Sequence, residues 1–105
     1  MNAWRRFEIL LPLRFNDGQP VPDIVIGETL LALEEHFGAV TWETQIIRGL
    51  WHHEGQVYSD DSMRVTVDVA DSDANREFFR QFKEGLKVRF RQIDIWMTTH
   101  LIDVV

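Results

Sequence analysis

Apolar and polar residues alternate with a period of two in several stretches of the chain, and this pattern predicts β-strands. The stretches span residues 5–13, 56–69 and 92–104, and a further apolar segment covers residues 40–51. Segments 40–51 and 56–69 are predicted to form a hairpin, whose turn lies around Gly55. Pro12 cannot donate a hydrogen bond, so pairing should weaken there. Residues 60–62 are expected to form a bulge or a break in the ladder.

Two other segments carry apolar residues at helical spacing, over residues 24–37 and 74–90. Asp23 or Gly27 is expected to cap the first helix, and Gly38 suits its left-handed end. Ser72, among its acidic neighbours, offers a cap for the second helix. The apolar face of the second helix places Phe82 at its centre, so truncation of that side chain should destabilise the fold strongly.

The predicted order of elements is β-α-β-β-α-β, in a single domain over residues 1–105. This is the ferredoxin-like split β-α-β arrangement, an α+β fold. Right-handed crossovers place both helices on one face of a four-stranded antiparallel sheet with strand order 4-1-3-2. The opposite face of the sheet is therefore expected to lie open.

Alternation assigns a mixed set of side chains to this open face: Glu8, Leu10, Arg64, Thr66, Asp68, Asp94, Trp96, Thr98 and His100. Leu10 and Trp96 are large and apolar, which favours a cover over part of the face. We expect a homodimer through the open sheet face, with Leu10, Arg64, Trp51 and Trp96 as the ligand or dimer surface. A monomer with scattered surface aromatics is the alternative, and a small-molecule ligand is possible.

The net charge of −6 disfavours nucleic acid as a partner, because phosphates repel an acidic surface. Residues 23–75 contain eleven acids against Arg48 and Arg64. There is no cysteine, which excludes thiol nucleophiles and thiolate metal sites. The longest apolar runs are too short to span a bilayer, so no membrane association and a cytoplasmic location are expected. No sequence motif for a cofactor is present, and none is expected.

His52 and His53 are candidate metal ligands, with Glu54, Asp60 and Asp61 nearby in the sequence. Adjacent residues on a strand point to opposite sides, so an exposed hairpin turn is favoured and no metal is expected. His100 beside Asp94 or Asp68 is a candidate general base, with a surface histidine as the alternative. These three histidines are the weak catalytic candidates.

Two further groups of residues have both a functional and a structural interpretation. The bases Arg76, Arg80, Lys83 and Lys87 share a helix face and could hold an acidic partner, a phosphate or RNA, although a solvated helix face is favoured. The aromatics Trp42, Trp51, Tyr58 and Trp96 could line a small apolar pocket, although core and edge packing is favoured.

The segment from residue 20 to residue 70 resembles small uncharacterised bacterial proteins. The resemblance rests on Phe37-Gly38-Ala39-Val40-Thr41, on Gly49-Leu50-Trp51, and on Gly55, Tyr58 and Asp60. It implies a ferredoxin-like fold and supplies no activity.

These observations favour a homodimeric binding or interaction module without catalysis. The alternative is a small cofactor-independent enzyme, an isomerase or monooxygenase of the dimeric α+β barrel type. The positions of His52, His53 and His100 distinguish the two, because the enzyme needs at least one of them in a concave pocket.

Overall fold

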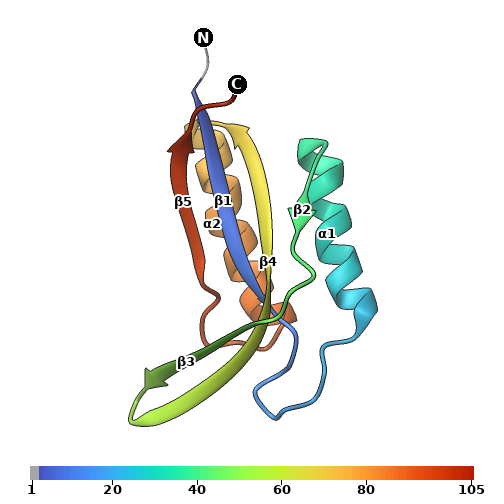
Figure 1. Ribbon diagram of the computed structural model, residues 1–105, viewed down its shortest axis with the longest axis vertical. Helices are drawn as coiled ribbons and strands as arrows, with labels where there is room; N and C mark the ends of the chain where they lie inside the picture. The colour runs from blue at the N-terminus through green and yellow to red at the C-terminus, as the bar shows by residue number, and fades with distance from the viewer. Residues whose placement is uncertain (1–2) are drawn as a thin grey trace.

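The computed structural model describes residues 3–105 and contains two helices and five strands (Figure 1). In chain order they are β1 (Trp4–Pro12), α1 (Asp23–Phe37), β2 (Thr41–Trp42), β3 (Ile47–His53), β4 (Gln56–Ala70), α2 (Asp73–Arg89) and β5 (Met97–Ile102). The strands form one antiparallel sheet in the order β2-β4-β1-β5, and β3 also pairs with β4. The predicted α+β class is confirmed.

The prediction of four strands is wrong, because the second predicted strand is broken into β2 and β3. Trp42 pairs with Val65, and Ile47 pairs with Ser62. Residues 43–46 therefore lie opposite only residues 63 and 64, and the extra residues interrupt the ladder. The expected break at residues 60–62 is also wrong, since β4 runs through them without interruption.

The β3–β4 hairpin is long and extends beyond the helices at the lower left of Figure 1. Its turn lies at Glu54 and Gly55, where φ is 49° and 78°. Positive φ at both central residues is the type I′ geometry that matches the twist of a two-residue hairpin. The turn predicted around Gly55 is confirmed.

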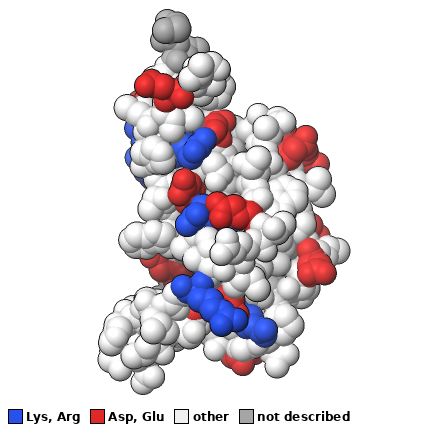
Figure 2. All heavy atoms as spheres, in the orientation of Figure 1, with Lys and Arg blue, Asp and Glu red and all other residues white. Residues whose placement is uncertain are grey.

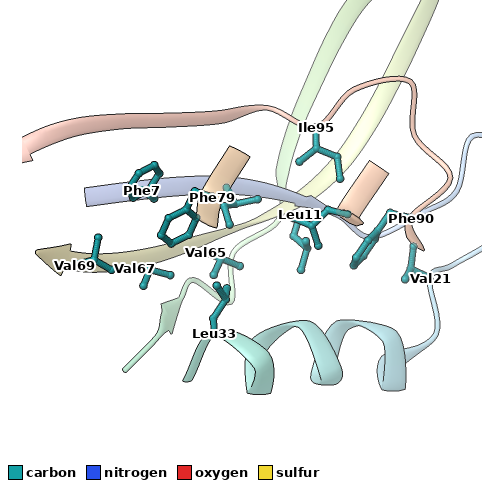
Figure 3. Packing of buried hydrophobic residues seen from close by; sticks show 12 residues of the cluster. Phe7, Leu11, Val21, Leu33, Val65, Val67, Val69, Phe79, Phe90 and Ile95 are labelled. Carbon is teal, nitrogen blue, oxygen red and sulfur yellow. The ribbon is translucent and has the colours of Figure 1, made fainter. Parts of the chain in front are cut away.

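The core lies between the sheet and the two helices (Figure 3). The strand alternation predicts its sheet side: Phe7, Ile9, Leu11, Val65, Val67 and Val69 are all buried. On the helix side, Phe79 is buried and stacks on Phe7, with 3.9 Å between ring centroids. Phe82 is only partly buried, so the centre of the apolar face lies at Phe79.

Two of the predicted helix ends are confirmed. Gly38 adopts φ 85°, and its N–H donates to the carbonyl of Glu34 at 2.7 Å. The hydroxyl of Ser72 accepts from the N–H of Asn75 at 3.1 Å. The predicted cap of the first helix is wrong, because α1 begins after Pro22 without a side-chain hydrogen bond.

The last strand is shorter than predicted and begins at Met97. Residues 92–96 approach the sheet as an extended segment whose end joins the ladder, because the N–H of Leu10 donates to the carbonyl of Trp96 at 3.0 Å. Ile95 is buried as expected, but Ile93 is 40% exposed. Within residues 3–105, neither helix has the length and apolar character needed to cross a bilayer.

Candidate functional site: the open sheet face and its groove

The centre of the open face carries charged side chains that are paired with one another. Arg6 forms two hydrogen bonds with Asp68, at 2.8 and 3.0 Å, and this partner raises the pKa of Arg6. Arg64 lies 3.2 Å from Glu43 and 3.9 Å from Glu8. Figure 2 shows the result as alternating positive and negative groups along the middle of this face. The centre of the face therefore has little uncompensated charge.

A groove of about 630 Å³ lies at one end of this face, where the hairpin meets the segment before β5. Its walls come from four parts of the chain. β1 contributes Leu10 and Pro12, β3 contributes Ile47 and residues 49–53, β4 contributes Asp60 and Ser62, and the last wall is residues 92–96. This volume falls within the range of small-molecule sites.

Trp51 forms a large part of the hairpin wall. Its ring stacks on Tyr58 across the β3–β4 pair, with 4.5 Å between centroids and 20° between planes. The indole Nε1 of Trp51 is shielded from solvent and has no acceptor among residues 3–105. A shielded donor without an acceptor costs about 1–3 kcal/mol. Trp51 therefore presents its ring to the groove, while its Nε1–H stays buried.

Asp60 provides a half-buried carboxylate in the same groove. Within the described part of the chain it makes no ion pair and no side-chain hydrogen bond, whereas neighbouring Asp61 lies 3.6 Å from Arg14 and 3.5 Å from Arg48. None of the described lysines or arginines lines the groove. The free carboxylate of Asp60 is therefore available to accept hydrogen bonds from a bound molecule.

Asp94 was expected on the open face, but its carboxylate lies 3.2 Å from Nζ of Lys83 on α2. Burial alone would raise the pKa of Asp94. The hydrogen bonds from Lys83 and from the backbone N–H of Ile95, with the charge of Lys87, outweigh burial and lower it. Asp94 therefore ties the segment before β5 to the helix layer and stays ionised.

The three candidate histidines separate into two groups. His52 and His53 line the groove, whereas His100 lies on β5 opposite Arg6 and outside the groove. Asp68 and Asp94, the predicted partners of His100, are bonded to Arg6 and Lys83. Nothing in this arrangement supports a general base at His100. Among residues 3–105, no three His, Asp or Glu side chains gather in a group that could hold a metal ion.

The basic stripe on α2 is neutralised by acids. Arg76 binds Asp71 and Asp73, Arg80 binds Glu77, Lys83 binds Asp94 and Lys87 binds Glu84, all within 3.2 Å. Hydrogen bonds and charge in these pairs raise the pKa of Arg76 and lower that of Glu77. The stripe is a solvated, ion-paired helix face.

We expect no binding to duplex DNA at physiological salt. The net charge is −6, and the four bases of the stripe are already paired with acids. A gel-shift assay at micromolar protein in about 150 mM salt tests this. A shifted band that weakens as the salt concentration rises would contradict the expectation.

Most of the residues predicted for the ligand or dimer surface gather at the groove. Leu10, Trp51 and Trp96 line it, and Arg64 lies beside it in its pair with Glu43. Of the predicted aromatic set, Tyr58 supports Trp51, but Trp42 pairs with Val65 and takes no part in the groove. Sequence reasoning missed Asp60, Ser62 and Ile93 as groove residues. The shared parity of residues 58, 60, 62 and 64 on β4 is the signal that could have identified the first two.

No family model matches the chain, and no curated protein matches it, so no named family is assigned. The fold does have similar solved structures. A phage SAM lyase in complex with S-methyl-5′-thioadenosine aligns with TM-score 0.66 and 12% identity over 98% of this chain and 91% of that chain. A phage SAM lyase in the apo state aligns with TM-score 0.59 and 16% identity over 99% of this chain and 86% of that chain. CutA from Synechococcus elongatus aligns with TM-score 0.60 and 8% identity over 97% of this chain and 79% of that chain. At these identities the likeness is one of fold.

Proposed function

We propose that this protein is a noncatalytic binding module that assembles as a homodimer through its open sheet face. The observation that carries the proposal is Trp96, whose side chain is 67% exposed at the rim of the groove, beside Leu10. An exposed indole is a large apolar surface, and aromatic side chains are enriched where proteins associate.

The hairpin strengthens this argument. Leu50, one of the residues that line the groove, is 75% exposed. A two-stranded ribbon without a covering layer is only marginally stable in water. In Figure 2 the hairpin is almost free of charged groups at the lower left. A second copy that covers this region would bury apolar surface.

Charge does not oppose such a contact at the centre of the face. Arg6 pairs with Asp68, and Arg64 pairs with Glu43 and lies 3.9 Å from Glu8, so these five groups leave only one net negative charge. Burying charges that are already paired avoids the cost of leaving a lone charge without water. A two-fold contact presents the same patch from both copies, so each copy provides the complement.

Sedimentation velocity of the unmodified protein from about 1 to 100 µM tests the proposal, a range that brackets micromolar association. We expect the average mass to rise from 12.4 kDa toward twice that value. A mass that stays at that of one chain over the whole range would contradict the homodimer.

A second candidate function is catalysis by a small cofactor-independent enzyme, such as an isomerase or monooxygenase of the dimeric α+β barrel type. His52 and His53 favour it, because both line the groove that also contains Asp60. The similar phage protein is described as a SAM lyase and carries S-methyl-5′-thioadenosine, which makes SAM a concrete first substrate to test.

We expect incubation with SAM to yield no S-methyl-5′-thioadenosine above the level without protein, as measured by liquid chromatography and mass spectrometry. A noncatalytic module returns SAM unchanged. If S-methyl-5′-thioadenosine forms with the unmodified protein but not with a His52→Gln, His53→Gln double variant, the protein is an enzyme and not a noncatalytic binding module. A matched His100→Gln variant, outside the groove, should leave any such activity in place.

A further inference from the structure

We propose that the groove binds a small, uncharged amino-substituted heteroaromatic molecule of the purine nucleoside class. The groove is built by one chain, from β1, β3, β4 and residues 92–96, so this inference does not depend on self-association. Its volume of about 630 Å³ suits a molecule of nucleoside size and is too small for a folded partner.

The walls favour a flat aromatic ring. Trp51 and Trp96 line the groove from the hairpin and from the segment before β5. Tyr58 stacks behind Trp51 at 4.5 Å between centroids and holds that indole in place. Indoles are good stacking surfaces for nucleobases and other heteroaromatic rings, whose π-faces they match.

The accessible polar group beside these rings is an acceptor. The half-buried carboxylate of Asp60 lines the groove and makes no ion pair or side-chain hydrogen bond within residues 3–105. An aminopurine ring carries the complementary group, an exocyclic amino group that donates hydrogen bonds. A ring that stacks on an indole could therefore donate from its amino group to Asp60.

The charge of the groove excludes phosphorylated ligands. Its lining contains Asp60 and Asp94, but neither lysine nor arginine from the described part of the chain. The positive charge of Lys83 is engaged by Asp94 at 3.2 Å. A phosphate placed here would meet carboxylates and no fixed cation, so a nucleoside should bind better than its nucleotide.

The test is a ¹H–¹⁵N NMR titration of the full chain with adenosine, which reports each tryptophan Nε1–H separately. The signals of Trp51 and Trp96 should shift and saturate. Those of Trp4 and Trp42, which lie outside the groove, should not move. Absence of any saturable shift, or equal shifts of all four indoles, would overturn the proposal.

Two comparisons refine the test. Adenosine 5′-monophosphate should bind at least about ten-fold more weakly than adenosine. Asp60→Asn should weaken adenosine binding by a similar factor, whereas Asp103→Asn, an exposed acid outside the groove, should not. Equal affinities for adenosine and its monophosphate would refute the charge argument. Equal adenosine affinities of Asp60→Asn and the unmodified protein would refute the role of Asp60. Sedimentation reports self-association separately, so either proposal can fail without the other.

Discussion

Replacement of Phe79 by alanine should lower the free energy of unfolding by about 3–5 kcal/mol, the usual cost of truncating a buried phenylalanine. Phe79 is 1% exposed and forms the contact between α2 and the sheet. Its ring stacks on Phe7 of β1 at 3.9 Å and on Phe37 of α1 at 5.2 Å between centroids. Alanine therefore leaves a cavity where three elements meet.

Chemical denaturation followed by circular dichroism measures this change. The matched control is Phe82→Ala, one helical turn further along α2, where the ring is only partly buried and its loss should cost less. A stability loss for Phe82→Ala equal to or larger than that for Phe79→Ala would show that the core is centred elsewhere.

The pair Phe79 and Phe82 also shows what periodicity can predict. Helical spacing identifies the apolar face of α2, because residues three and four apart share a side. It does not identify which member of the face lies deepest, since that depends on where β1 crosses beneath the helix. Phe7 lies against Phe79, and this long-range contact decides the order.

The broken second strand has a similar explanation. The residues of segment 40–51 have the apolar character of a strand, and both of its halves do pair with β4. The ladder is interrupted because residues 43–46 outnumber the residues of β4 that they face. Such an interruption depends on how two strands pair, so the sequence of one strand does not reveal it. The polar run Asp60-Asp61-Ser62 suggested a break on β4, whereas the extra residues lie on the other strand.

The candidate site could be predicted in part. Strand parity assigned Leu10, Arg64 and Trp96 to the open face, and the structure pairs Leu10 with Arg64 and bonds the N–H of Leu10 to the carbonyl of Trp96. The groove itself depends on the long twisted hairpin and on the irregular path of residues 92–96, neither of which follows from alternation. The sequence therefore predicts Asp60 in a bulge or break, whereas Asp60 belongs to the continuous strand β4 and lines the groove.

Replacement of Trp96 by glutamate should shift the proposed homodimer toward monomer while the fold is retained. A tryptophan side chain presents about 200 Å², and the 67% of Trp96 that is exposed corresponds to roughly 3 kcal/mol of apolar surface at about 25 cal/mol per Å². The glutamate would also bring a charge without a partner into the contact. Together these effects predict at least about a 100-fold weaker association.

Sedimentation velocity of both proteins at matched concentrations measures the shift, and circular dichroism confirms that the variant is folded. Val88→Glu is the matched control, because Val88 is 80% exposed on α2, in the helix layer behind the sheet, and gains the same charge. It should leave the association unchanged. If Trp96→Glu associates as tightly as the unmodified protein, or if Val88→Glu disrupts the dimer equally, the open sheet face is not the contact. The indole would then belong to the ligand groove alone, where its Nε1–H signal in the adenosine titration reports on it directly.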